Sequence, residues 1–220
     1  FDKSLNLEDK LIESGKHEFV EKLNPSKFSK IKFHYVMQNE QNGLGHAISL
    51  AEDLIHDEPF AVLLPDDLFF SEDSCLSQLK RTYMKTNSSV IAVNRIDKNN
   101  IHKYGVISPG IQEANTIEIL DIIEKPNAYE APSDIAVCGR YILTSSIFKK
   151  LKNVKPDKSG EIQITDAIKL LIEDETVNAC IYEGEKFDCG SKLGFVEATI
   201  AISLRDKEIG HEVKDMINKL

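Results

Sequence analysis

The sequence predicts an α/β fold: a three-layer sandwich whose central sheet is mixed and largely parallel, with a small antiparallel portion. Two observations carry this prediction. Short apolar runs of strand length alternate with longer segments of helical periodicity, which is the pattern of helices that connect the strands of one sheet. Between residues 105 and 143, three strand-like segments follow one another with only turns between them, which indicates antiparallel pairing.

The N-terminal segments predict a helix, a strand and a second helix. Residues 5–23 repeat apolar side chains at a period near 3.6, so one helix is expected there, already in progress at Phe1. Residues 32–38 are rich in β-formers and predict a strand that ends at Gln38. A glycine turn then leads into a helix over residues 45–55.

Two buried strands with a helix between them are expected next. Residues 60–64 (FAVLL) form a short apolar run, which is typical of a buried central strand. A helix is predicted over residues 75–85 and a second buried strand over residues 89–94 (SVIAVN).

The remainder continues the same alternation. Strands are expected over residues 105–108, 116–123, 135–143 and 177–182, and helices over residues 146–152, 162–172, 192–203 and 212–220. No internal repeat or linker interrupts these elements. Residues 1–220 are therefore expected to form a single domain, with residues 212–220 as a C-terminal helical tail.

Composition excludes several classes of protein. The 220 residues are 41% apolar and 29% charged, which is ordinary for a soluble globular protein. A net charge of −9 argues against nucleic-acid binding, which needs concentrated Lys and Arg. No apolar run approaches ~18 residues and no basic-then-apolar leader is present, so neither a membrane span nor secretion is predicted.

The four cysteines indicate a reducing compartment. They are scattered without a C-x-x-C spacing, so zinc is not expected, and a chain of this length does not need disulfides. Reduced thiols in the cytoplasm are the simplest interpretation.

Polar side chains stand at several strand ends, where open α/β sheets bind their ligands. Gln38 carries an amide that can both donate and accept, as the edge of a uracil or thymine ring requires. The turn at Gly43-Leu44-Gly45 would let the backbone approach the same base. Taken alone, this pattern is better explained by a Gln38 that lies at the surface and by glycines that only form a turn.

Asp66 and Asp188 are the candidate metal ligands. Mg²⁺ prefers hard oxygen ligands and usually takes one or two carboxylates together with phosphate oxygens. The alternative for each is a solvated aspartate or a helix N-cap. Asp67, next to Asp66, is the one expected to be a cap.

Glu124-Lys125-Pro126 follows a predicted strand and could bind a sugar phosphate. The carboxylate can accept from vicinal sugar hydroxyls and the ammonium can neutralise a phosphate, although a surface ion pair is the common alternative. Gly105 would let a sugar ring lie against bare backbone, or simply form a tight turn. Lys192 begins a helix, where anions are favoured.

Seven motifs in this order resemble those of the bacterial UTP–glucose-1-phosphate uridylyltransferases. They are Gln38 with GLGHA, LLPDD, YGV (104–106), EKP (124–126), VCGRYIL (137–143), GEIQITDAI (160–168) and FDCGSKLGF (187–195). The last two are quite specific to this branch, and the resemblance extends over effectively the whole chain. Taken by itself, GEIQITDAI also reads as a capping-box helix start, although its Glu161 could face the sugar.

The resemblance implies a nucleotide-diphospho-sugar transferase fold, a site and a reaction. Uracil would contact Gln38 and Gly43, Mg²⁺ would be held by Asp66 and Asp188, glucose hydroxyls by Gly105 and Glu124, and phosphates by Lys125 and Lys192. Asp66, Lys125 and Asp188 would be the catalytic residues. UTP and glucose 1-phosphate would give UDP-glucose and pyrophosphate, and the family's habit favours a homo-oligomer.

The sequence departs from this family in one respect. Its members open with a G-x-G-T-R loop and a P-K-E segment, and neither occurs in these 220 residues. The chain is therefore expected to lack its N-terminal phosphate-loop segment and first central strand, to turn over negligibly by itself and to leave its sheet incompletely covered. The alternatives are a non-catalytic regulatory paralogue that binds nucleotide sugar, and a related pyrophosphorylase that uses dTTP or ATP.

Overall fold

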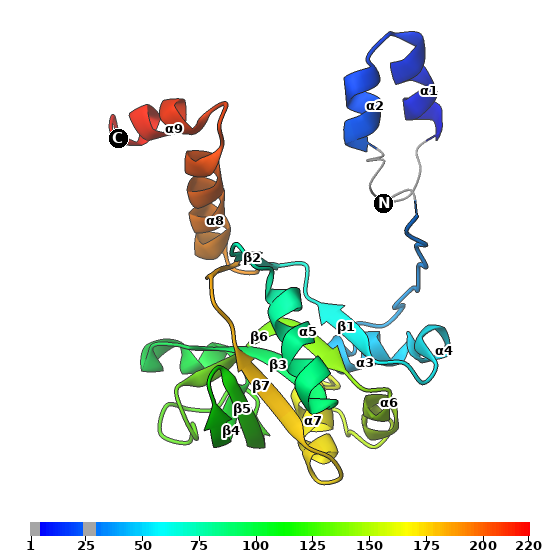
Figure 1. Ribbon diagram of the computed structural model, residues 1–220, viewed down its shortest axis with the longest axis vertical. Helices are drawn as coiled ribbons and strands as arrows, with labels where there is room; N and C mark the ends of the chain where they lie inside the picture. The colour runs from blue at the N-terminus through cyan, green and yellow to red at the C-terminus, as the bar shows by residue number, and fades with distance from the viewer. Residues whose placement is uncertain (1–4, 24–29) are drawn as a thin grey trace. The chain divides into compact units, whose positions relative to one another are not determined.

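The computed structural model describes residues 5–23 and 30–220 (Figure 1). The chain divides into two compact units, Phe1–Asn39 and Glu40–Leu220, which are described separately. Phe1, where the sequence predicts a helix already in progress, lies outside the described residues.

The first unit contains two helices where the sequence predicts one. They are α1 (Leu5–Glu13) and α2 (His17–Leu23). Gly15 lies between them with φ +69°, donates its N–H to Ile12 O, and is followed by Lys16, whose N–H reaches Leu11 O. This is a Schellman ending, which a glycine at positive φ allows and which stops the helix. The prediction of one continuous helix is therefore wrong.

Residues 30–39 form no strand, so the predicted strand over residues 32–38 is also wrong. The β-forming side chains of this segment, Tyr35 and Val36 among them, are exposed. A β-rich segment becomes a strand only by pairing with a neighbour. No strand pairing in the described part of the chain includes these residues.

The second unit is built on a six-stranded sheet in the order β1-β6-β3-β7-β5-β4. The strands are β1 (Phe60–Leu63), β3 (Ser89–Arg95), β4 (Val106–Glu113), β5 (Thr116–Ile123), β6 (Ile135–Leu143) and β7 (Val177–Ile181). β4 also pairs with β6 through Val106 and Ala136, so the sheet curls toward closure at this end.

The sheet is mixed, as predicted, but it is not largely parallel. Among the described pairings only that of β3 with β7 is parallel. β1 and β3 run in the same direction, as strands joined by a helix do, but β6 lies between them and is antiparallel to both. Chain order reveals the direction of two consecutive strands and not which strand will be inserted between them.

β1 lies at the edge of this sheet and not at its centre, contrary to prediction. Its residues alternate between half-buried and exposed, and Leu63 is 51% exposed. An apolar run of this length does not distinguish a central strand from an edge strand, because both contain apolar side chains.

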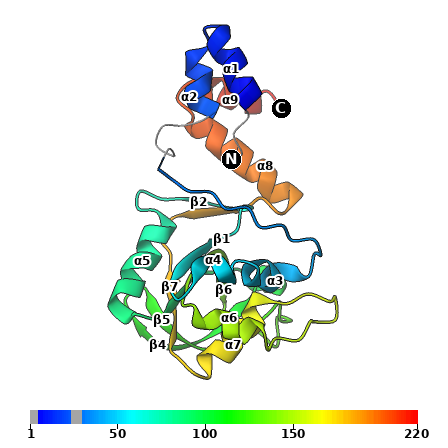
Figure 2. The same cartoon turned by 90° about the vertical axis from the view of Figure 1, so that its right-hand side faces the viewer.

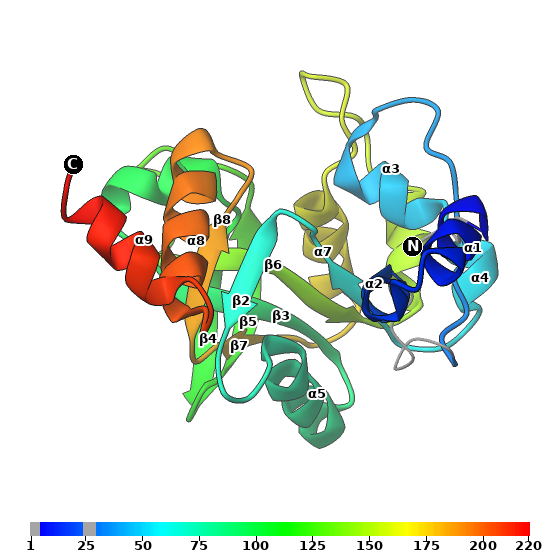
Figure 3. The ribbon, with the colours of Figure 1, turned by 90° about the horizontal axis from the view of Figure 1, so that it is seen from above.

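Helices cover both faces of the sheet, which confirms the three-layer sandwich (Figure 3). β3 shows how the faces are shared: Val90 and Ala92 pack into a core with α5 (Cys75–Thr86), while Ile91 and Val93 pack into a larger core on the other face. The larger core includes side chains of α3 (Gly43–Ser49), α6 (Ser146–Leu151) and α7 (Ile164–Ile172). Alternate residues of a strand point to opposite faces, so one strand supplies both cores.

The remaining elements include a small antiparallel sheet that the sequence reading did not identify as strands. It consists of β2 (Asp67–Phe70) and β8 (Glu185–Asp188), and α8 (Lys192–Arg205) and α9 (Gly210–Ile217) continue from it (Figure 2). Two short helical segments, α4 (Glu52–Ile55) and the 3₁₀ helix η2 (Lys98–Lys103), complete the unit. No helix among the described residues has the length and apolarity to cross a membrane.

Candidate active site

The β2–β8 ladder brings the two candidate metal ligands together. Asp188, the last residue of β8, is paired in register with Asp67, the first residue of β2, and Asp66 directly precedes Asp67. The Cys189 N–H donates to Asp66 O over 2.8 Å. Two aspartates 122 positions apart in the sequence thus meet because two four-residue strands pair.

Both carboxylates face the same small space beside Gly190. A Cβ at Gly190 would lie 2.8 Å from Oδ2 of Asp66 and 3.1 Å from Oδ1 of Asp188. The described residues contain no group of three or more His, Cys, Asp or Glu side chains arranged for a metal ion. Two converging carboxylates fit Mg²⁺, which completes its octahedron with water and substrate phosphate.

Asp67 is not a helix cap, contrary to expectation. It begins β2, is only 7% exposed, and its Oδ2 accepts from the Gly139 N–H over 2.8 Å. Its Oδ1 lies 2.9 Å from Nζ of Lys186, and both side chains are largely buried. A buried carboxylate needs such compensation, so Asp67 anchors the loop that carries Asp66.

Arg140 holds the same loop from the adjacent strand. Its guanidinium donates to Leu64 O over 2.7 Å and to Asp67 O over 2.8 Å, and it lies 4.5 Å from the centroid of the Phe69 ring. The fixed fork of an arginine suits two carbonyls at once. The main chain on both sides of Asp66 is therefore fixed by one side chain.

Tyr104 contacts Asp188 from the side of η2. Its hydroxyl donates to Oδ2 of Asp188 over 3.3 Å, and Nζ of Lys186 lies 4.9 Å from its ring centroid. Burial raises the pKa of Tyr104, so the hydroxyl stays protonated to a higher pH than an exposed tyrosine would. Burial opposes the charge of Lys186, yet its pKa is raised, because the neighbouring Asp67 carboxylate stabilises the ammonium and accepts a hydrogen bond from it.

The residues predicted to bind the sugar also converge. Glu124 follows β5 and accepts from the Thr165 hydroxyl over 3.0 Å, and Lys125 Nζ lies 3.6 Å from its other oxygen. Gly105 is buried, and a Cβ there would lie 2.8 Å from Cγ2 of Thr165 and 3.3 Å from Oε2 of Glu124. A larger residue at position 105 would displace both neighbours.

Tyr104 joins this group to the aspartates. Its carbonyl accepts from the Lys125 N–H over 3.1 Å, while its hydroxyl contacts Asp188. Lys125 has φ +45°, an uncommon conformation for a residue with a side chain. Lys125 follows β5, and its exposed side chain lies beside the Glu124 carboxylate.

The remaining predicted site residues are Gly43, Lys192 and Gln38. Gly43 begins α3 with φ +88° and packs against residues 161–162. Lys192 is the first residue of α8 and is exposed. Gln38 belongs to the first unit, so its position relative to Gly43 is not defined.

Four supporting residues were missed by the sequence reading, namely Tyr104, Arg140, Thr165 and Lys186. Two of them carry a signal in the sequence. Arg140 interrupts an otherwise apolar strand, and Lys186 precedes Asp188 by two residues, which places both on one face once β8 is recognised as a strand.

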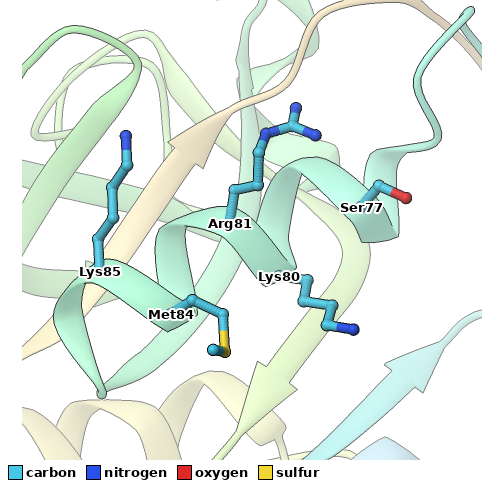
Figure 4. Close-up of a pocket in the computed structure, with 5 residues that line it drawn as sticks. All are labelled: Ser77, Lys80, Arg81, Met84 and Lys85. Carbon is cyan, nitrogen blue, oxygen red and sulfur yellow. The ribbon is translucent and has the colours of Figure 1, made fainter.

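At least two hollows lie on the second unit. One of about 210 Å³ has Tyr104, Lys186 and Asp188 among its walls, so it adjoins the site. The larger, about 440 Å³, lies on the outer face of α5 and is lined by Ser77, Lys80, Arg81, Met84 and Lys85 (Figure 4). Because it includes none of the predicted site residues, it is not the candidate site.

Known proteins are similar to this chain in sequence and in fold. Residues 11–203 match the family model described as nucleotidyl transferase. A Staphylococcus epidermidis protein named UTP–glucose-1-phosphate uridylyltransferase is 41% identical over 220 residues, which are 100% of this chain and 76% of that protein.

Two solved structures are also similar. A UDP-glucose pyrophosphorylase complexed with UDP-glucose is 40% identical with a TM-score of 0.79, over 93% of this chain and 75% of that one. A UTP-bound enzyme of the same kind from Acinetobacter baumannii is 32% identical with a TM-score of 0.89, over 100% of this chain and 77% of that one. With this similarity over nearly its whole length, the chain belongs to the nucleotidyl transferase family, among the UTP–glucose-1-phosphate uridylyltransferases.

Proposed function

We propose that this chain carries the base-, sugar- and metal-binding parts of an enzyme that makes UDP-glucose and pyrophosphate from UTP and glucose 1-phosphate. The observation that carries this proposal is the convergence of Asp66 and Asp188, joined through Tyr104 to Glu124 and Lys125. Together these groups have the chemistry needed to bind a nucleotide phosphate beside a sugar phosphate.

Each residue has a role that follows from its chemistry. Glu124 accepts hydrogen bonds from glucose hydroxyls over the bare backbone of Gly105, and Lys125 neutralises the sugar phosphate. The turn at Gly43 contacts uracil, and Lys192 adds positive charge near the phosphates. The sugar phosphate oxygen attacks the α-phosphorus of UTP in line and pyrophosphate leaves, so positioning and charge neutralisation supply the catalysis.

Mg²⁺ is the proposed metal, held by Asp66 and Asp188. When bound, it neutralises charge on the phosphate oxygens. Replacing Gly190 by alanine tests the proposal, because the new methyl group would occupy the space that both carboxylates face. We expect Mn²⁺, used as a spectroscopic substitute, to bind at least tenfold more weakly while the urea midpoint changes little. Unchanged Mn²⁺ binding would remove the metal site from this position.

Nucleotide preference is tested by calorimetry with the 220-residue chain. We expect UDP-glucose to bind more tightly than dTDP-glucose or ADP-glucose, with Glu124→Gln lowering the affinity for UDP-glucose and leaving UDP little affected. Preference for either competitor would favour a related pyrophosphorylase, and binding of none of the three would refute the proposed function.

Turnover is a separate expectation. No glycine-rich phosphate loop occurs in these 220 residues, so we expect the chain by itself to release negligible pyrophosphate from UTP and glucose 1-phosphate. Measurable UTP-dependent release would show that other residues hold the triphosphate. A reading frame that encodes G-x-G-T-R upstream of Phe1 would favour the enzyme over a regulatory paralogue.

Self-association is proposed from the C-terminal helices. α8 exposes large apolar side chains around much of its surface, including Leu193, Phe195 and Val196. Large exposed apolar patches typically mark contact surfaces, and a second copy of the chain is the proposed partner. Light scattering should give a dimer or larger assembly, and Phe195→Ser should shift it toward the monomer. A monomer at all concentrations would overturn this.

The cytoplasm is the proposed compartment. All four cysteines are free, and Cys75, Cys138 and Cys180 are buried. Unpaired thiols are usual where the surroundings are reducing. Fractionation of cells that express the protein would test this location.

A further inference from the structure

The segment that begins α7, residues 162–165, contacts both the glycine turn proposed to bind the base and the carboxylate proposed to bind the sugar. Thr165, in the first turn of α7, is 4% exposed, and its Oγ1 donates to Oε2 of Glu124 over 3.0 Å. The Glu124 side chain is 25% exposed, so this hydrogen bond is partly shielded from solvent. A hydrogen bond to a charged group is stronger than one between neutral groups, and more so where water is scarce.

The two oxygens of Glu124 have different neighbours. Oε2 is held by Thr165, whereas Oε1 lies 3.6 Å from Nζ of Lys125, whose side chain is 57% exposed. An exposed lysine on a flexible stem fixes a carboxylate poorly. Thr165, which is buried on a helix, therefore determines the direction in which the carboxylate points.

The methyl group of Thr165 contributes to the same geometry. A Cβ at Gly105 would lie 2.8 Å from Cγ2 of Thr165, so this methyl group packs directly on the bare backbone of Gly105. The hydroxyl and the methyl of one side chain thus contact the two residues proposed to bind glucose. A structural threonine at a helix start would need neither contact.

Three residues earlier, the same segment holds the glycine turn. The Gly45 N–H donates to Ile162 O and the Ile162 N–H donates to Asn42 O, each over 2.8 Å. These two bonds belong to the backbone, so they persist when the side chain of Thr165 changes. Residues 162 and 165 therefore contact the base-binding turn and the sugar-binding carboxylate independently.

We propose that Thr165 is a positioning residue for Glu124, which orients the carboxylate toward the glucose hydroxyls of the bound nucleotide sugar. This inference rests on the proposed function, because it takes Glu124 as the glucose ligand. It assigns a role to a residue whose surrounding motif, taken by itself, reads as an ordinary helix start.

The test compares two ligands that differ only in glucose. Calorimetry with the 220-residue chain would measure UDP-glucose and UDP binding to the wild type, Thr165→Val and Thr165→Ser. Valine keeps the methyl contact with Gly105 and removes the donor, and serine keeps the donor. We expect Thr165→Val to bind UDP-glucose roughly tenfold more weakly than the wild type and to bind UDP within about twofold of it. Thr165→Ser should keep most of the wild-type affinity for UDP-glucose.

Thr86→Val is the matched control. The Thr86 hydroxyl donates to Thr82 O and accepts from the Ser88 hydroxyl, both at the end of α5, so its loss should leave both affinities unchanged. Equal UDP-glucose binding by the wild type and Thr165→Val would overturn the proposal. An equal loss for UDP and UDP-glucose would do the same, because it would indicate general disturbance of the helix.

A second measurement separates this proposal from the proposed function. If the wild type binds neither ligand, the function fails. Crystal structures of the wild type and Thr165→Val would then still decide the positioning role. A Glu124 carboxylate that rotates away from its wild-type direction supports the role, and an unmoved carboxylate refutes it.

Discussion

Single residues behind the carboxylates decide whether Asp66 and Asp188 can meet. Asp67 and Lys186 form an ion pair that is largely removed from water, and Arg140 holds two carbonyls of the same loop. None of these three residues stands out by type, since charged residues make up 29% of the chain. Their contacts with one another and with the loop that carries Asp66 are what distinguish them.

Lys186→Met should therefore be strongly destabilising. It leaves Asp67 buried without its cation, which typically lowers the free energy of unfolding by about 3 kcal/mol or more. The double variant with Asp67→Asn should recover much of this loss, because no buried charge then remains. Urea unfolding at pH 7 measures both.

Lys152→Met is the control for that experiment. Lys152 pairs with Glu52 over 2.7 Å, but the two side chains are 63% and 38% exposed. Exposed pairs contribute less than about 1 kcal/mol. If Lys152→Met and Lys186→Met lower the free energy of unfolding by similar amounts, the burial of the Lys186–Asp67 pair has no energetic consequence.

At the scale of elements, segment type follows from local chemistry, while segment ends depend on particular backbone conformations. α5 agrees with prediction within one residue at its C-terminal end. Ser74 caps its start by accepting from the Ser77 N–H, and Asn87 ends it at φ +49°, with its N–H on Tyr83 O. Asparagine is among the few residues that tolerate this left-handed conformation.

Position 87 offers a test with opposite signs. Asn87→Ala should lower the free energy of unfolding by about 1 kcal/mol, because alanine is strained at positive φ. Asn87→Gly should leave it equal or higher, because glycine adopts this conformation without strain. Thermal unfolding of the two variants measures the difference, and equal losses would mean that the helix end is held by other contacts.

At the scale of the whole molecule, the sheet separates two cores of different composition. The larger core is almost entirely aliphatic, whereas the smaller one, beneath α5, contains Cys75, Cys138, Cys180 and Tyr182. Burial raises the pKa of Cys138 from 9.0 to about 12, and burial together with the neighbouring thiols does the same for Cys75. These thiols are therefore protonated in the folded protein well above neutral pH.

This makes the protein sensitive to alkali. A raised folded-state pKa contributes stability that is complete below the unfolded value of 9.0 and is lost as the pH rises toward about 12. The free energy of unfolding should therefore decline above pH 9, by about 1.4 kcal/mol per pH unit for each such thiol.

Cys138→Ala identifies the thiol in that decline. The smaller side chain lowers stability at every pH through the cavity it leaves, but the slope above pH 9 should decrease by the share of one thiol. Urea unfolding between pH 8 and 10.5 gives both slopes. Identical slopes for variant and wild type would exclude Cys138 as a contributor.

The sequence by itself determined the type of most elements, the mixed α/β class and the family, and it supplied the candidate ligands. These follow from periodicity and from side-chain chemistry, which are local properties. It did not determine the break at Gly15, the absence of a strand over residues 32–38 or the antiparallel majority of the sheet.

Only the tertiary structure decided what lies next to what. It placed β1 at the edge, inserted β6 beside β3, and paired β2 with β8 so that Asp66 and Asp188 face Gly190. It also made Asp67 a buried anchor and brought Thr165 to Glu124. These are contacts between residues far apart in the chain, which depend on the packing of whole elements and leave no pattern in either segment alone.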